Sequence, residues 1–214
     1  MAAAFSRTRG YLPKDLVELQ RYIVAGEKVL DLGCGNGRFS ALFEPADYLG
    51  ADASAELIKI AQEKYPDKQF GVVEPLKLPF PDGSFDKVFC LAVIHHLPST
   101  AYRRQFLAEI KRVLKPGGKL ILTSWYLLHQ PKTWGKLVKL AFLKLGGKNR
   151  LDLGDMLVPF STGGGEVLAQ RYLHVFSVTG LRRLVAGEGF RVEQRGLVKR
   201  GRNRNIEVVA SINK

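Results

Sequence analysis

The sequence predicts an α/β protein with a doubly wound, Rossmann-like sheet of seven mostly parallel strands and an inserted helical lid. Apolar runs of strand length alternate with helical patterns along most of the chain, which is typical of such sheets. Acids stand at the ends of the first two runs, at Asp31 and Asp52. A glycine-rich stretch from Gly33 to Gly37 follows the first acid.

The expected elements follow one another in chain order. Strands are predicted at 28–32, 47–51, 69–73, 85–92, 119–124, 191–197 and 205–212. Helices are predicted at 37–43, 55–65, 102–114, 130–150 and 177–187. The Pro-Gly-Gly sequence at 116–118 is a turn signal that stops the third helix before the fifth strand. We expect 1–214 to form a single domain, with 126–176 as a lid or substrate insertion.

Composition indicates the kind of partner and the compartment of the protein. The chain has 33 Lys and Arg against 20 Asp and Glu, a formal net charge of +13. Such a charge favours a polyanionic partner, either nucleic acid or an anionic membrane; the alternative is a solubilising positive surface. The chain has neither an 18-residue apolar run nor an apolar secretory leader, and it has only 2 Cys. We therefore expect a reduced, cytoplasmic protein without a transmembrane segment.

The stretch 29–37 reads Val-Leu-Asp-Leu-Gly-Cys-Gly-Asn-Gly. Glycine-rich loops after a strand commonly cradle nucleotide phosphates. Here the glycines run G-x-G-x-G rather than G-x-G-x-x-G, and the charge of Asp31 would repel a pyrophosphate. The stretch resembles the cofactor loop of the class I S-adenosylmethionine-dependent methyltransferases, where this charge suits the ammonium and sulfonium end of the cofactor. The resemblance implies contacts to S-adenosyl-L-methionine from Asp31, Gly33, Cys34, Gly35 and Gly37.

A second acid, Asp52, ends the next strand close to the spacing of a ribose-binding acid in nucleotide-binding βαβ units. The alternative is a surface aspartate that caps the helix beginning near Ser54. The glycine loop upstream favours the cofactor. Further cofactor contacts are expected after the third and fourth strands, at the switch point of the sheet. The expected contacts beyond the glycine loop and Asp52 are Ala53, Glu74, Pro75, Leu76, Ala92 and His95.

The adjacent histidines His95 and His96 raise the alternative of a metal site. No cluster of Cys or His stands elsewhere at ligand spacing, so we expect no zinc or other metal. One of the two is expected to line the cofactor pocket, while the other packs or caps the following helix.

Further segments resemble a narrower family, the tRNA wobble-uridine carboxymethyl methyltransferases. These segments extend over nearly the whole chain, beyond the cofactor core shared by the class. They are the Phe-Ser-x-Thr-Arg element at 5–9, residues 92–97 with Arg103 and Arg104, residues 109–118, the 155–160 segment and the Arg-Tyr-x-His-x-Phe element at 171–176. Phe160 stands where the family has tryptophan, and near the C-terminus Asn205-Ile206 stands where the family tends to have Asn-Trp.

The resemblance implies methylation of the carboxylate of 5-carboxymethyluridine in a tRNA anticodon, giving a methyl ester. Arginine is the natural partner of a substrate carboxylate. Arg171 and His174 are the expected contacts, together with Arg9, whose element would cover the pocket. The alternative is that Arg171 pairs with an acid such as Asp155 and the aromatic residues pack in the core. Relatives in eukaryotes work with a small zinc-binding activator protein, which is a further expected partner.

Two basic segments bear on the partner. Residues 130–150 carry six Lys and Arg and no acid, with apolar residues at helical spacing, which predicts a basic amphipathic helix. That helix is either a tRNA-facing lid, a peripheral membrane contact or a core-packed helix with a solvated lysine face. Residues 199–204 form a second basic run, expected in a hairpin loop that contacts phosphate. The alternatives to tRNA modification are a small-molecule or lipid-quinone methyltransferase and a non-catalytic cofactor-binding subunit.

Overall fold

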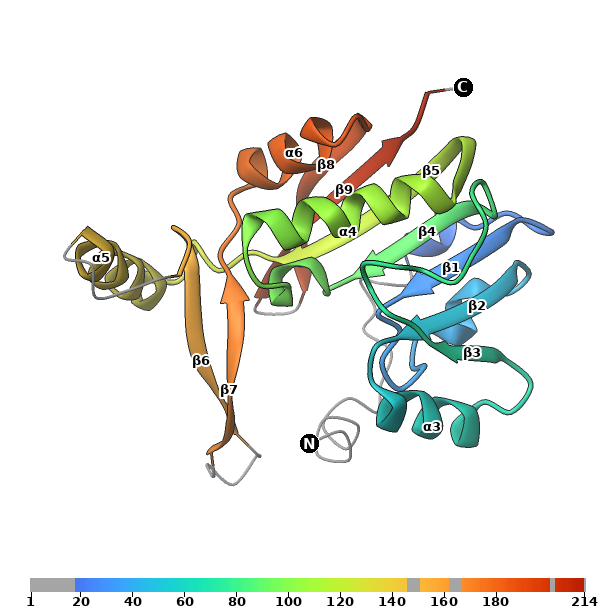
Figure 1. Cartoon of the computed structure of the whole chain (residues 1–214), viewed down its shortest axis with the longest axis horizontal. Coiled ribbons are helices and arrows are strands. Elements are labelled where there is room, and N and C mark those ends of the chain that lie inside the picture. Colours follow the sequence, from blue (N-terminus) through green and yellow to red (C-terminus); the bar gives the residue numbers. More distant parts are fainter. Residues whose placement is uncertain (1–17, 146–150, 162–166, 201–202, 214) are drawn as a thin grey trace.

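The protein is built on one central sheet. The computed structural model describes residues 18–145, 151–161, 167–200 and 203–213. The strands of the sheet are β1 (Lys28–Leu32), β2 (Asp47–Asp52), β3 (Gln69–Val72), β4 (Phe85–Leu91), β5 (Leu114–Trp125), β8 (Arg191–Arg200) and β9 (Asn203–Ser211). Their order is β3-β2-β1-β4-β5-β9-β8, with β1 to β5 parallel and β9 antiparallel to both neighbours (Figure 1). The predicted seven-stranded, mostly parallel sheet is confirmed.

The remaining elements connect these strands and form one insertion. The helical segments are η1 (Glu18–Tyr22), η2 (Ser40–Phe43), α3 (Ala55–Lys64), η3 (Ile94–His96), α4 (Thr100–Val113), α5 (Pro131–Leu145) and α6 (Val178–Gly187). A separate two-stranded hairpin consists of β6 (Asp155–Ser161) and β7 (Val167–His174). Helices α3, α4 and α6 each begin after a serine, Ser54, Ser99 or Ser177, whose hydroxyl accepts a backbone N–H of the first turn.

Side chains of alternate strand residues build a core on each face of the sheet. On one face, Leu30 and Val88 pack against Phe106 of α4 and Leu181 of α6, and α4 lies along β4 and β5 in Figure 1. On the other face, Val29 and Phe89 belong to a cluster with Leu19 of η1 and Phe43 of η2, closed by a stack of Phe43 on Tyr48. Because β1 and β4 are covered on both sides, the carboxyl-end loops of these strands rest on a rigid support.

The structure differs from the expected elements in two places. The predicted helix at 37–43 is only the short 3₁₀ turn η2, because the three glycines upstream hold positive φ angles that a helix does not tolerate. The insertion contains the expected helix, α5, and also the β6–β7 hairpin, which the sequence did not predict. Among the described residues, no helix is long and apolar enough to cross a bilayer.

α4 ends at Val113, and the Pro-Gly-Gly sequence at 116–118, predicted as a turn before the fifth strand, lies inside β5 instead. Leu114 pairs with Phe85, and the next paired residue of β5 is Lys119, opposite Lys87. Gly117, with φ of 78°, lies inside this irregularity. The basic run at 199–204 likewise continues the two last strands, since Arg200 pairs with Asn203; residues 201 and 202 of that run lie outside the described residues.

Gly50 provides a test of the packing between β2 and β3. A Cβ atom at this position would lie 2.5 Å from Phe70 Cδ1 and 2.7 Å from the Tyr48 hydroxyl, so we expect Gly50→Ala to lower the free energy of unfolding by about 1–3 kcal/mol. Gly71 in the neighbouring strand has nothing within 4 Å of the same position. Gly71→Ala should therefore change stability by less than about 0.5 kcal/mol. Urea unfolding measures both; equal stability of the two variants would contradict this packing.

Candidate active site

The carboxyl ends of β1, β2, β3 and β4 meet along one edge of the sheet, and the predicted cofactor residues lie there. The N–H groups of Gly33 and Cys34 both donate to the carbonyl oxygen of Ala51, at 2.7 and 3.1 Å, so the glycine loop is tied to the end of β2. The N–H of Val73 donates to the carbonyl oxygen of Asp52 at 3.0 Å, which ties the start of the third loop to the same strand. Three loops thus form one continuous rim.

Asp52 is held in place by backbone donors from both sides of the rim. One carboxylate oxygen accepts the N–H of Gly35 and the other accepts the N–H of Ser54, each at 2.9 Å. Each oxygen keeps a second lone pair, so the half-buried carboxylate still has capacity to accept hydroxyl donors of a ligand. Burial raises the pKa of Asp52 against the opposing effect of these backbone hydrogen bonds. The helix cap proper is Ser54, so Asp52 is not required for that role.

Asp31 lies beneath the glycine loop, with only 1% of its surface exposed. Its carboxylate accepts a hydrogen bond from the Tyr48 hydroxyl at 3.2 Å. Burial, assisted by the nearby charge of Asp52, raises the pKa of Asp31 to about 7 in spite of that hydrogen bond. A buried carboxylate in this state gains stability when a positive charge binds close to it.

The glycines of the loop are required by shape as well as by backbone angle. Gly33 has a φ of 83°, and a Cβ there would lie 2.3 Å from Val93 Cγ2. Gly37 has a φ of 72°, and a Cβ there would lie 2.8 Å from Phe70. A close-fitting glycine loop between two carboxylates fits a ligand that carries both a cation and a diol. The two carboxylates and the glycine loop therefore match the chemical groups of S-adenosylmethionine.

The other predicted contacts differ in how accessible they are. Ala53 and Glu74 are exposed, and Pro75, Leu76 and Ala92 are half-buried along the rim. Ala92 ends β4 with a φ of 60° and donates its N–H to Thr123 of β5. His95 is 1% exposed, lies 3.3 Å from the Ser124 hydroxyl through Nδ1, and packs on Trp125 with ring centroids 4.7 Å apart.

Arg171 extends this stack from the inserted hairpin. Its guanidinium carbon lies 4.9 Å from the ring centroid of Trp125 and 5.6 Å from that of Phe160, so the cation is held between two aromatic rings. Its Nε atom is buried and has no hydrogen-bond partner among the described residues. Burial lowers the pKa of the guanidinium, and no acid of the described chain offsets this cost. The predicted alternative, an ion pair with Asp155, does not form.

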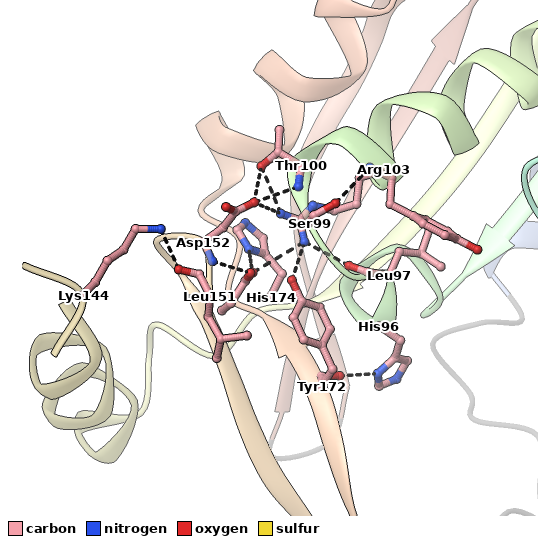
Figure 2. A network of polar contacts seen from close by, with 12 residues as sticks. His96, Leu97, Ser99, Thr100, Arg103, Lys144, Leu151, Asp152, Tyr172 and His174 are labelled. Atoms are coloured by element: carbon pink, nitrogen blue, oxygen red, sulfur yellow. Dashed lines mark hydrogen bonds and ion pairs between the residues drawn. The ribbon is translucent and has the colours of Figure 1, made fainter. Parts of the chain in front are cut away.

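Asp155 pairs with His174 instead. The His174 Nδ1 atom lies 2.6 Å from Asp155 Oδ1, and Arg103 of α4 lies 3.6 Å from the same oxygen. Figure 2 shows this network, in which Arg103 also donates to the Tyr172 hydroxyl at 2.8 Å and to the carbonyl oxygen of Leu97 at 3.0 Å. Burial alone would raise the pKa of Asp155, but the hydrogen bond with His174 and the charge of Arg103 hold it below its usual value.

Two of the three residues predicted to hold the substrate, Arg171 and His174, are therefore not brought together. Arg171 and His174 are an odd number of residues apart in β7 and point to opposite faces of the hairpin. Arg9 lies outside the described residues. Trp125, which was not among the predicted site residues, contacts both His95 and Arg171. Its place at the carboxyl end of the fifth parallel strand was the signal that could have identified it.

Both thiols are unsuited to chemistry at this edge. Cys34 and Cys90 are buried, and burial raises the pKa of each above its ordinary value. Neither thiol is a source of thiolate near neutral pH. Within the described ranges, no group of three or more His, Cys, Asp and Glu side chains is placed to hold a metal ion.

Sequence comparisons identify relatives of two kinds. A family model described as a methyltransferase domain matches residues 30–122. A protein of Encephalitozoon cuniculi, named as a methyltransferase with no stated substrate, is 34% identical over 180 residues, which cover 83% of this chain and 77% of that protein. The tRNA (carboxymethyluridine(34)-5-O)-methyltransferase of Arabidopsis thaliana is 33% identical over 125 residues, or 58% of this chain. The chain matches only 30% of the length of that plant protein.

Solved structures share the fold. A SAM-dependent methyltransferase of Methanosarcina mazei is 22% identical with a TM-score of 0.75, over 92% of this chain and 97% of that chain. A methyltransferase solved in complex with the Trm112 methyltransferase activator of Haloferax volcanii is 17% identical with a TM-score of 0.66, over 98% and 92% of the two chains. Given the sheet, the matching domain and the Encephalitozoon relative, this chain belongs to the class I S-adenosylmethionine-dependent methyltransferases, and S-adenosylmethionine is its methyl donor.

Proposed function

We propose that the enzyme methylates the carboxylate of 5-carboxymethyluridine at the tRNA wobble position and forms a methyl ester. The observation that carries the proposal is the state of Arg171. Its guanidinium is half-buried between two rings, its Nε lacks a hydrogen-bond partner among the described residues, and no described acid pairs with it. A partly desolvated cation without a counter-ion gains stability when an anion binds. A planar carboxylate matches its fork.

We assign the cofactor to the rim of the sheet. Asp52 would accept the ribose hydroxyls, with Ala53 beside it; Glu74, Pro75 and Leu76 would border the adenine. The methionine end would lie over Gly33, Cys34, Gly35 and Gly37, with Asp31 acting on its positive charge from beneath the loop. Ala92 and His95 would close the inner side, next to Trp125. Residues 126–176, with α5 and the β6–β7 hairpin, would cover the substrate side.

The reaction needs little proton transfer. When bound, the cofactor supplies an electrophilic methyl group on a positively charged sulfur. The substrate carboxylate is ionised at neutral pH, so its oxygen is already a nucleophile. The task of Arg171 is to align that oxygen, and Trp125 and Phe160 fix the plane of the guanidinium. His174 would support the hairpin through Asp155 rather than touch the substrate.

The basic run at 199–204 supports an RNA substrate through its position. β9 is antiparallel to β5, so Asn205 pairs with Trp125, and the carbonyl oxygen of Arg204 accepts the N–H of Tyr126 at 2.9 Å. The cationic end of the β8–β9 hairpin therefore borders the same edge as Arg171. Phosphates that flank a nucleoside in the site would meet these charges.

Two relatives add to the proposal. The Arabidopsis protein carries in its name the proposed reaction, and the Haloferax methyltransferase was solved with an activator protein. We propose that this chain also binds a small zinc-binding activator of that kind. β3 is an edge strand with exposed Val72, and no described strand pairs with its outer side, where a strand could be added.

Cofactor affinity should depend on pH through Asp31. With a pKa of about 7 in the free protein, Asp31 is protonated below that pH and must lose the proton to favour a bound cation. Affinity for S-adenosylmethionine should therefore be flat above about pH 7 and fall by up to about tenfold per unit below it. Titration calorimetry from acidic to neutral pH measures this.

Two variants separate the roles of the carboxylates. Asp31→Asn should bind with an affinity that no longer depends on pH in this range. Asp52→Asn should keep the pH dependence and lose about 1.5–3 kcal/mol of binding free energy at every pH, because ribose hydrogen bonds to a charged acceptor are lost. An unchanged pH dependence in Asp31→Asn would contradict the proposed action of its charge.

Arg171→Lys tests the substrate assignment. Lysine keeps the charge and loses the bidentate fork, so turnover should fall by about 10–100-fold, a loss of about 1.4–2.7 kcal/mol in transition-state positioning. The assay is methyl-ester formation on tRNA that bears carboxymethyluridine, with labelled cofactor also offered to a lipid extract. Labelling of the lipid extract alone would favour a lipid-quinone methyltransferase.

The matched control is Arg182→Lys on the exposed side of α6, which should keep parental activity. Cofactor affinity and melting temperature of Arg171→Lys should also stay near parental values. Full activity of a normally folded Arg171→Lys enzyme would contradict the proposal that Arg171 binds the substrate carboxylate.

RNA binding at the β8–β9 hairpin should respond to salt. Neutralising Lys199, Arg200, Arg202 and Arg204 together should reduce the slope of log affinity for tRNA against log salt by up to about 3.6, because each lost phosphate contact contributes about 0.9. Filter binding over a salt series measures the slope, while cofactor affinity serves as the control. A slope equal to that of the parent would exclude this hairpin from the RNA site.

A further inference from the structure

Helix α5 lies at one end of the molecule, beyond the hairpin, as Figure 1 shows. Leu137 and Leu140 on its inner side pack with Met156 and Leu173 of the hairpin. Lys144 at its carboxyl end donates to the carbonyl oxygen of Leu151 at 2.6 Å. The helix is therefore anchored to the protein along one side, and its other sides carry side chains that are exposed within the described part of the chain.

One of these sides is an apolar stripe. Trp134, Val138 and Phe142 are 54, 51 and 70% exposed. They are spaced four residues apart, so they lie along one side of the helix. The Trp134 ring is fixed, because its Nε1 donates to the carbonyl oxygen of Leu128 at 2.9 Å. The helix thus presents three large apolar side chains to water. This exposure is unfavourable, and no described residue covers their exposed surface.

A row of lysines borders the stripe. With about 3.6 residues per turn, the exposed side chains of Lys132, Lys136 and Lys139 fall next to it, on the side away from the protein. No acid occurs from 126 to 151. An apolar stripe beside an uninterrupted row of cations is the pattern of a helix that lies at the interface of an anionic bilayer.

We propose that the stripe of Trp134, Val138 and Phe142 and its lysine row dock the enzyme onto the surface of an anionic lipid membrane. Acyl-chain ends of the headgroup layer remove the apolar side chains from water, and lipid phosphates meet the lysines. This docking is independent of the proposed tRNA substrate, whose binding surface we assign to the β8–β9 hairpin.

Two other occupants match the surface less well. A nucleic-acid backbone offers charge to the lysines but no apolar partner for Val138 and Phe142. A second copy of the chain would bring lysine rows together in a protein whose net charge is +13, and like charges at an interface are unfavourable. The lipid surface satisfies both halves of the pattern.

The test is co-sedimentation of the full chain with vesicles of phosphatidylglycerol and phosphatidylcholine in equal parts, against phosphatidylcholine alone. The parent should bind the anionic vesicles and be released by salt. Val138→Ser with Phe142→Ser should lower the partition coefficient by about 10-fold or more. Lys132→Gln, Lys136→Gln and Lys139→Gln together should lower it by about 100-fold. Val24→Ser, a change of an equally exposed apolar residue before β1, should have no effect.

The two tryptophans of the chain provide a second readout. Brominated lipids should quench part of the fluorescence of the parent, and Trp134→Phe should abolish the quenching while leaving vesicle binding in place. Absence of parental binding to anionic vesicles would overturn the proposal. A serine double variant that binds vesicles as the parent does would also overturn it. If that variant instead loses tRNA binding, the stripe is a contact surface for RNA. Self-association lost in the same variant, with vesicle binding intact, would give it to a second copy.

Discussion

Arg103 is 1% exposed, and its guanidinium joins α4 to the inserted hairpin. A cation at that depth is stable only when it is paired and fully hydrogen-bonded, and removal of one partner from such a pair commonly costs about 3–5 kcal/mol. The partners come from both sides: Leu97 and Thr100 near the start of α4, and Asp152, Asp155 and Tyr172 of the insertion. The contacts of Arg103 therefore hold the insertion in one position against the sheet.

That position determines where Arg171 points. Tyr172 is held by Arg103, and neighbouring residues of a strand face opposite ways. Once Tyr172 faces α4, Arg171 must face Trp125 at the end of β5. The network of Arg103, Asp155 and His174 on one face of the hairpin thus fixes the direction of Arg171 on the other face. The aromatic contacts of Arg171 then hold its plane without neutralising its charge.

Local patterns predict the sheet well, because β1, β4 and the second half of β5 are buried almost continuously and their apolar runs are contiguous in the sequence. Asp52 and the glycine loop were identified for the same reason, since strand end, acid and turn are contiguous. The β6–β7 hairpin was missed because its apolar residues, such as Met156 and Leu173, pack on α5 and on the segment after β5 rather than on the sheet. The pairing of Asp155 with His174 and Arg103 is a contact between distant segments, which no short motif encodes.

The position of β9 has a consequence for biosynthesis. β9 lies between β5 and β8, although it follows both in the chain. During translation, the strands β1 to β5 and the glycine loop emerge well before the strand that covers the open edge of β5. The loops that follow β1 to β4 are thus complete while the flank of Trp125 still lacks Asn205 and its neighbours. A nascent chain is therefore expected to complete the loops at the ends of β1 to β4 first and the flank of Trp125 last.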